Sequence, residues 1–306
     1  MIYNLNMDKL LTHLLQSAHS TPRPVDDALI TKAYDFAKLA HTGQKRKNGD
    51  DFITHPVAVA THLAVWNMDT PTIVAGLLHD TIEDGGAKRS DLITEFGQDI
   101  ADLVEGVTKV SGFHLTGSTD EKFVENLRKM FLSMSHDLRV VMVKFADRLH
   151  NLQTLSALEP ERQVRYAREI IEVFSPLADR LGLHHLKGQL EDLAFPFAYP
   201  DDYQKLTAQT TKIFEKSITL TETFRQDLLK ILAKEIPDVS IDIRRKHLFS
   251  LYKKLNRPEI SGDLAKIHDI IAARVITKTV AECYQVLGLV HNHFRHVPYL
   301  GVSDFI

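Results

Sequence analysis

The chain has 306 residues, 44% hydrophobic and 25% charged, which suits a soluble protein of about two domains. Its net charge of −3 excludes a general positive field for nucleic acids or anionic membranes, so an anionic substrate must meet a local basic patch or a metal. Its single cysteine, Cys283, excludes an internal disulfide and favours a reducing compartment. The N-terminus lacks the order of a signal peptide, and no apolar run approaches the roughly 20 residues that cross a bilayer. We therefore expect a cytoplasmic protein that binds neither membranes nor nucleic acids directly.

Helical patterns fill the chain from about Val25 to Ala194. Apolar residues recur there at spacings of three and four, and almost nothing alternates with a period of two. The spacing predicts helices over residues 30–40, 55–66, 72–81, 91–108, 121–135, 138–155, 163–181 and 185–193. Turn-forming pairs such as Asn48-Gly49 and Gly85-Gly86 separate these runs. We therefore expect an all-α domain over residues 1–195.

The pattern changes after Pro196. Residues 196–236 are predicted to form a helical linker, and the alternation of Val239, Ile241 and Ile243 with polar residues predicts a strand. A helix over 250–255, a strand over 271–276 and a helix over 280–294 are expected next. This order indicates the opening of an α/β domain over residues 237–306. The expected fold class is mainly α, with a partial α/β segment after the helical domain.

The chain contains 16 histidines, which prompts a search for a metal site. The most unusual segment reads LLHDTIED, from Leu77 to Asp84. On a helix, His79 and Glu83 would lie on one face, and Asp80 and Asp84 on the next. Crowded carboxylates repel one another and lose hydration on burial, and a divalent cation removes that conflict. Imidazole and carboxylate ligands suit Mn, Fe or Zn better than Ca. An exposed polar helix end is the alternative.

Two further segments carry charge where it is unexpected. Asp147 interrupts an apolar helical run, and a buried aspartate requires either a metal or an ion pair with Lys144 or Arg148. The run Lys45-Arg46-Lys47 leads into a turn, where it could hold phosphates or stack on a base, or be a solvated charge run. His55 begins the next helix and is either a fourth ligand or a helix cap.

The order His…His-Asp…Asp resembles the signature of the HD superfamily, all-α metal-dependent phosphohydrolases. Longer segments resemble the hydrolase domain of the long RelA/SpoT homologues: HTGQKRKNGDDFITHP, AGLLHDTIEDG, VEGVTKV, ENLRKMFLSMSHDLRVVMVKFADRLHNLQTL and FSPLADRLGLHHLKGQLEDLAF. The likeness runs from about residue 25 to the C-terminus. It implies a guanosine-3′,5′-bis(diphosphate) 3′-pyrophosphohydrolase of the stringent response, which converts ppGpp and pppGpp to GDP or GTP and pyrophosphate.

The resemblance also implies a role for each matching residue. The implied sets are a manganese site of His55, His79, Asp80 and Asp147, an acidic pair of Glu83 and Asp84 that orients and deprotonates the attacking water, and a nucleotide site of Arg46, Lys47, Asn48, Asn151 and Thr154. Many relatives have serine at position 48, so Asn48 predicts an altered affinity and not a loss of activity. The implied partner is (p)ppGpp, and the chain could also form a homodimer.

The C-terminal segments IDIRRKHLFSLYKKL, IHDIIAARVI and CYQVLGLVHNHFRHVP resemble the start of the family's synthetase domain, a nucleotidyltransferase-like fold. The matching residues are Arg244, Lys246, His247, Ser250 and the magnesium-binding Asp269. Where relatives carry Gly-Arg-Phe-Lys-Asp-Tyr-Ile, residues 300–306 read LGVSDFI, and the strand with the second catalytic acid is not reached. The resemblance therefore predicts an inactive synthetase-like segment, with Mg²⁺ bound only if that segment were active.

Two rival functions remain open. The first is an HD hydrolase of another nucleotide, such as a deoxynucleoside triphosphate or a cyclic nucleotide, which the Arg46-Lys47 turn disfavours. The second is a non-catalytic alarmone sensor, which the intact pair Glu83-Asp84 disfavours.

Overall fold

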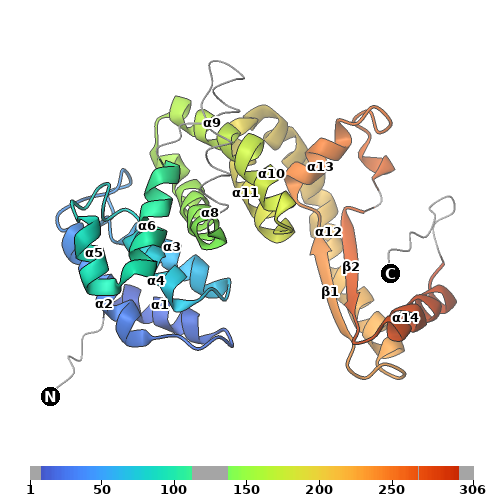
Figure 1. Ribbon diagram of the computed structural model, residues 1–306. Coiled ribbons are helices and arrows are strands. Elements are labelled where there is room, and N and C mark those ends of the chain that lie inside the picture. Colours follow the sequence, from blue (N-terminus) through green and yellow to red (C-terminus); the bar gives the residue numbers. More distant parts are fainter. Residues whose placement is uncertain (1–7, 112–136, 268, 296–306) are drawn as a thin grey trace. The chain divides into compact units, whose positions relative to one another are not determined.

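The computed structural model describes residues 8–111, 137–267 and 269–295 (Figure 1). Contacts divide the chain into two compact units, Met1–Ala198 and Tyr199–Ile306. Helices dominate the described residues, which also contain a two-stranded sheet, so the mainly α fold predicted from the sequence is confirmed. The helix predicted over residues 121–135 and the divergent residues 300–306 lie outside the described residues.

The first unit is built from helices joined by short turns. These are α1 (Lys9–His19), α2 (Asp27–Ala40), α3 (Thr54–Val65), α4 (Thr70–Leu78), α5 (Arg89–Phe96), α6 (Gln98–Ser111), α8 (Leu138–Gln153), α9 (Pro160–Glu169), α10 (Ser175–Arg180) and α11 (His184–Ala198). A short 3₁₀ turn, Leu155–Ala157, follows α8, and a π-helical turn, Ile170–Phe174, joins α9 to α10. The carboxylates of Asp26, Asp69 and Asp137 accept backbone N–H groups at the starts of α2, α4 and α8, and so fix where these helices begin.

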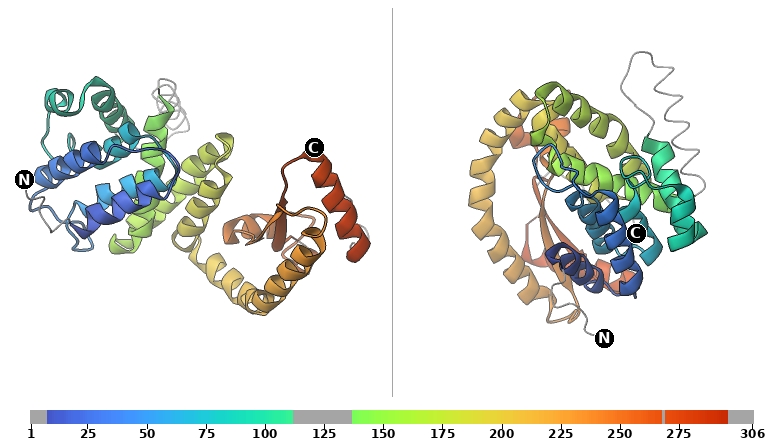
Figure 2. Two further views of the ribbon diagram at one scale, coloured as in Figure 1. Left: turned by 90° about the horizontal axis from the view of Figure 1, so that it is seen from below. Right: turned by 90° about the vertical axis from the view of Figure 1, so that its left-hand side faces the viewer.

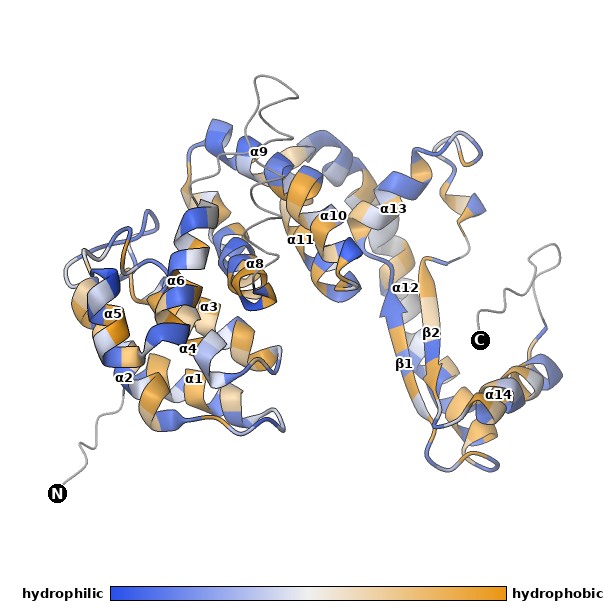
Figure 3. Cartoon of the chain, in the orientation of Figure 1, coloured by the Kyte–Doolittle hydropathy of each residue, from blue (hydrophilic) through white to orange (hydrophobic). Residues whose placement is uncertain are grey.

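Helix α4 lies at the centre of this unit. It packs against α2, α3, α6 and α8, and every residue from Thr72 to Leu78 is buried. A helix that is apolar on all sides has to be buried in this way, and Figure 3 shows that hydrophobic residues dominate α3 and α4. Because α4 is central, the polar residues that follow Leu78 emerge inside the unit instead of at its surface.

A glycine allows α3 and α4 to approach closely. A Cβ atom on Gly76 would lie 2.6 Å from Cδ1 of Leu63 and 3.4 Å from Cα of Ala60. Four residues join the two helices, and the start of α3 lies beside the end of α4. The rings of His55 and His79 accordingly lie with their centroids 5.1 Å apart.

Helix α4 ends at Leu78, so the predicted helix over residues 72–81 is too long. Two side chains bind the last carbonyls of α4: Nδ1 of His79 lies 2.8 Å from the Gly76 oxygen, and the Thr81 hydroxyl donates to the Leu78 oxygen at 2.6 Å. These contacts replace the next helical turn, and the chain continues in turns to Gly85. The prediction that His79 and Glu83 share a helical face is therefore wrong.

The predicted helix over residues 91–108 is also wrong in one respect, because it is interrupted. Gly97 separates α5 from α6 with φ of +84°, a left-handed conformation that glycine adopts without steric cost. The run predicted over 163–181 is helical almost throughout, but it contains the π-helical turn, whose Phe174 packs under the Arg148 guanidinium at 4.9 Å from the ring centroid.

The second unit contains α12 (Pro200–Leu232), β1 (Ser240–Arg245), α13 (Leu248–Leu255), β2 (Ile271–Ile276) and α14 (Val280–His293). The strands pair antiparallel, with Ser240 opposite Ile276. The linker predicted over residues 196–236 falls largely within α12, a long curved helix that packs on β1, α13 and α14 (Figure 2). A hydrophobic cluster joins α12, β1 and α14 and contains Leu228, Leu232, Ile236, Ile241 and Val286. In the described part of the chain, no helix has the length and apolar character that a membrane crossing requires.

We expect Gly76→Ala to lower the free energy of unfolding by about 1–3 kcal/mol, because the added methyl group overlaps the fully buried Leu63. Gly288→Ala in α14 is the control, since nothing lies within 4 Å of its added Cβ, and it should stabilise by about 0.5–1 kcal/mol. Chemical denaturation followed by circular dichroism measures both. Equal effects of the two substitutions would contradict the close packing of α3 on α4.

Candidate active site

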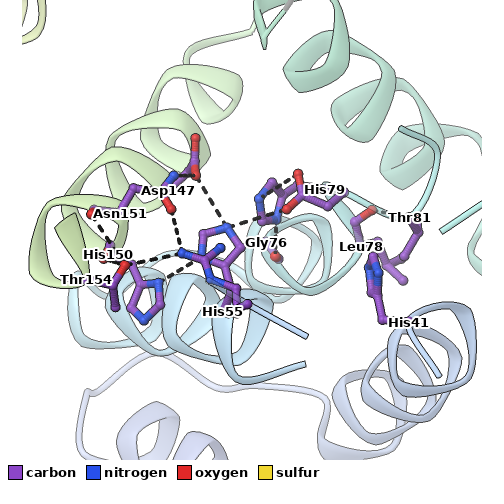
Figure 4. A network of polar contacts seen from close by, with 12 residues as sticks. His41, His55, Gly76, Leu78, His79, Thr81, Asp147, His150, Asn151 and Thr154 are labelled. Carbon is purple, nitrogen blue, oxygen red and sulfur yellow. Dashed lines mark hydrogen bonds and ion pairs between the residues drawn. The ribbon is translucent and has the colours of Figure 1, made fainter. Parts of the chain in front are cut away.

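Four ionisable side chains converge where α3, α4 and α8 meet (Figure 4). His55 lies in the first turn of α3, His79 and Asp80 follow α4, and Asp147 lies within α8. His55 Nε2 is 3.5 Å from Asp80 Oδ2 and 3.4 Å from Asp147 Oδ1, and His79 Nε2 is 3.1 Å from Asp80 Oδ1. The structure thus brings together the residues that the sequence predicts as metal ligands. His55 directs its ring at this cluster and does not cap α3.

The donor atoms of this cluster fit a divalent metal ion. His79 Nδ1 donates to the Gly76 carbonyl, so in the neutral ring the buried Nε2, which faces Asp80, carries a lone pair that a metal can bind. Ligand atoms of His55, His79 and Asp80 lie within 4.8 Å of one another. Neutral imidazoles oriented by a second hydrogen bond, together with carboxylates, form a typical ligand set for a divalent transition metal.

Without a metal, protons and a lysine balance the charge of the cluster. Burial lowers the pKa of the His79 imidazole, but the adjacent Asp80 carboxylate outweighs burial and raises this pKa to about 9. Burial raises the pKa of Asp147, but Lys144 and His55 outweigh burial and hold this pKa well below its ordinary value. The metal-free cluster therefore keeps Asp147 ionised and holds a proton on His79.

The two oxygens of Asp147 serve different partners. Oδ2 lies 3.0 Å from Lys144 Nζ, and both side chains are buried. Oδ1 faces His55 and accepts a hydrogen bond from Asn151 Nδ2 at 2.6 Å. A metal and an ion pair with Lys144, which the sequence presents as alternatives, are thus compatible. Arg148, the other predicted partner, instead lies 3.6 Å from Glu169 Oε1.

Glu83 and Asp84 lie on the turns that follow the cluster. They line a cavity of about 480 Å³ together with His55, Asp80 and Asp147. Burial raises the pKa of Glu83 and outweighs the opposing charge of Lys144. The turn is fixed to the segment before α3, because Gln44 Nε2 donates to the Asp84 carbonyl at 2.7 Å. A carboxylate of raised pKa beside a metal site is suited to accept a proton.

A second cavity, of about 380 Å³, has residues 45–48 of the basic turn in its lining. Arg46 Nη2 donates to Asn151 Oδ1 at 2.9 Å and to Thr154 Oγ1 at 3.3 Å. The Arg46 guanidinium also lies 5.9 Å from the centroid of the Phe52 ring. Since Asn151 also binds Asp147, a continuous chain of polar contacts joins the basic turn to the metal cluster. The residues that line both cavities are Arg46, Phe52, Asn151, Leu158 and Tyr166.

Asn48 is engaged within the turn that carries it. Its Nδ2 donates to Asp50 Oδ2 at 2.7 Å, and its Oδ1 accepts the Asp50 backbone N–H at 3.2 Å. Next to it, Gly49 has φ of +92° and Lys45 Nζ lies 2.6 Å from Asp51 Oδ1. Asn48 therefore shapes the turn on which Arg46 is presented.

The sequence analysis missed the contribution of α9. Arg162, Arg165 and Tyr166 line the larger cavity together with the candidate metal ligands. The available signal was the segment ERQVRYARE, in which Arg162 and Arg165 stand three residues apart and so share a helical face. These arginines bring to the carboxylate-rich cavity the positive charge that an anionic substrate requires.

In the second unit, two lysines flank Asp269. Lys246 Nζ lies 2.5 Å from Asp269 Oδ2, and Lys254 Nζ lies 2.8 Å from Oδ1. Although burial raises the pKa of Asp269, the two lysines lower it below its ordinary value. Both oxygens of the predicted magnesium ligand are therefore engaged by lysine. Arg244 lies on β1, while His247 precedes α13 and Ser250 lies within it.

Two family models match the chain: the HD domain over residues 33–184 and a region found in RelA/SpoT proteins over residues 243–306. A GTP pyrophosphokinase of Myxococcus xanthus is 41% identical over 272 residues, which are 88% of this chain and 36% of that protein. A guanosine-3′,5′-bis(diphosphate) 3′-pyrophosphohydrolase of Aquifex aeolicus is 39% identical over 297 residues, 96% of this chain and 40% of that protein. The chain thus spans two fifths or less of the length of these relatives.

A solved structure described as a metazoan ortholog of SpoT that hydrolyzes ppGpp aligns with 57% of this chain and 96% of its own, at 23% identity. The TM-score of this alignment is 0.42.

We expect metal binding at pH 7.5 to release about one proton per ion, because the metal-free His79 has a pKa of about 9 and a ligating imidazole must be neutral. The apparent affinity should therefore rise as the pH is raised from 6 towards 9. Titration calorimetry of Mn²⁺ into the metal-free chain, in two buffers of different ionisation enthalpy, measures the release. The control His62→Gln lies outside the cluster and should leave the number of protons released unchanged. Metal binding without proton release would contradict the assignment of His79.

Proposed function

We propose that this chain, a member of the RelA/SpoT family in its HD domain and its RelA/SpoT region, hydrolyses ppGpp and pppGpp to GDP or GTP and pyrophosphate. The observation that carries the proposal is the meeting of a metal cluster, an acidic pair and a basic turn at two adjoining cavities. The relative from Aquifex aeolicus, named as this pyrophosphohydrolase, supports it. We further infer a cytoplasmic enzyme, consistent with its single cysteine.

We infer that the resident ion is Mn²⁺, held by His55, His79, Asp80 and Asp147. The mixed imidazole and carboxylate donors support this assignment, as does the buried Nε2 of His79, which faces Asp80 within the cluster. When bound, the ion supplies two effects: it lowers the pKa of water and neutralises charge on a phosphoryl oxygen.

The chain's own residues do the rest of the chemistry. A Glu83 carboxylate oxygen accepts the proton of the attacking water, and its raised pKa supports that role. Asp84 orients the same water. As the water oxygen bonds to the phosphorus next to the ribose, the bond from that phosphorus to the ribose 3′-oxygen breaks. The 3′-oxygen takes up a proton from solvent and leaves as the hydroxyl of GDP or GTP, and the water oxygen stays in the released pyrophosphate. Arg162 and Arg165, which line the same cavity, bind phosphate oxygens and offset their charge.

The smaller cavity would hold the nucleoside. Arg46 stacks on guanine, while Lys47 and the turn shaped by Asn48 face the phosphates. Asn151 and Thr154 border the same space and hold Arg46 in place. Because Arg46 and Asn151 line both cavities, a ligand that fills both can place its base in one and its 3′-diphosphate in the other.

We also propose that the second unit of this chain does not synthesise (p)ppGpp. The engagement of both Asp269 oxygens by Lys246 and Lys254 supports this, because a magnesium ion would have to displace these two lysines.

The purified chain should release pyrophosphate from ppGpp with Mn²⁺ and lose this activity with EDTA, because the attacking water depends on the ion. Coupled detection of pyrophosphate, together with chromatography of the nucleotide product, measures both. A preference for dGTP over ppGpp would instead identify an HD hydrolase of another nucleotide. Stoichiometric ppGpp binding without turnover would identify a sensor.

Glu83→Gln should retain the metal but lower kcat by about 10²–10⁴-fold, because the amide keeps the shape of the side chain and cannot accept the proton. Asp80→Ala should lose both metal and activity, because it removes a ligand. Metal content by mass spectrometry and steady-state kinetics separate the two cases. Turnover of the Glu83→Gln variant at the wild-type rate would exclude Glu83 as the base.

A further inference from the structure

His150 contacts a candidate metal ligand without belonging to the ligand set. It lies on α8, three residues after Asp147, and its side chain is partly buried. Its Nδ1 lies 2.8 Å from Nδ1 of His55, and the two ring centroids are 5.0 Å apart (Figure 4). This is the hydrogen bond of His55 on the side of the ring that faces away from the carboxylates.

The ion proposed to bind His55 decides which ring donates in this contact. Two ring nitrogens at 2.8 Å form a hydrogen bond only when one carries a proton and the other does not. His55 Nε2 faces Asp80 and Asp147, the other proposed ligands. When an ion binds there, this nitrogen offers it a lone pair, and the proton of the neutral His55 ring then lies on Nδ1. The Nδ1 of His150 is therefore the acceptor, and its own proton lies on Nε2.

We propose that His150 is a positioning residue, whose Nδ1 accepts the Nδ1 proton of His55 and thereby holds His55 Nε2 towards the metal. This inference rests on the metal site of the proposed function. His79 obtains the same support from the backbone carbonyl of Gly76. The two ligating imidazoles thus differ, since the partner of His79 belongs to the backbone and that of His55 is a replaceable side chain. Oriented imidazoles of this kind bind metals more tightly.

Two substitutions of nearly equal size separate hydrogen bonding from packing. His150→Asn places an amide oxygen near the position of Nδ1 and keeps an acceptor, whereas His150→Leu removes it. We expect His150→Leu to weaken Mn²⁺ binding roughly 10–100-fold and His150→Asn to stay within about threefold of wild type. Calorimetry on the metal-free full chain, without nucleotide, measures both. Unchanged Mn²⁺ affinity in His150→Leu, or equal losses in both variants, would overturn the proposal.

A measurement on the unmodified chain provides the second test, so the inference does not depend on how the variants fold. In the Zn²⁺-loaded chain with ¹⁵N-labelled histidine, we expect a protonated Nδ1 on His55 and an unprotonated Nδ1 on His150. The reverse assignment would overturn the proposal. Because neither experiment uses nucleotide, both results stand apart from the hydrolysis assay. Failure to hydrolyse ppGpp would reject the proposed substrate and leave the role of His150 intact.

Discussion

Two carboxylates and two imidazoles meet between α3, α4 and α8, three of them buried and Asp80 partly exposed, and their charge has to be balanced there. Burial alone would drive protons onto Asp80 and Asp147. Lys144 and a proton on His79 counter this in the metal-free chain. A divalent ion provides more positive charge at one point, and the helices are packed so that the donor atoms face that point.

Helices α4 and α8 support the cluster in different ways. Helix α4 anchors the cluster, because its entirely apolar surface fixes it in the core and directs the chain after Leu78 inwards. Helix α8 joins the proposed metal and nucleotide sites on one face, since Asp147, His150, Asn151 and Thr154 recur at three- and four-residue spacing along it or at its end. A shift of α8 would therefore change the proposed metal site, the hydrogen bond of His150 to His55 and the lining of the smaller cavity together.

Periodicity predicted the mainly α fold, and the crowding of charge in LLHDTIED, together with the family resemblance, indicated the metal cluster. The end of α4 could not be predicted this way, because no glycine or proline marks it and side-chain bonds from His79 and Thr81 decide it. The pairing of His150 with His55 was equally inaccessible. Periodicity shows which residues share a face of one helix, but not which residues of another helix lie against that face.

The chain of contacts from Arg46 through Asn151 to Asp147 has a thermodynamic consequence. A nucleotide that draws Arg46 away leaves the amide of Asn151 free to change its hold on the carboxylate. Binding of a nucleotide in the smaller cavity is then linked to the affinity of the proposed metal site for its ion. Such linkage is reciprocal, so the ion must alter the affinity for nucleotide by the same factor that the nucleotide alters the affinity for the ion.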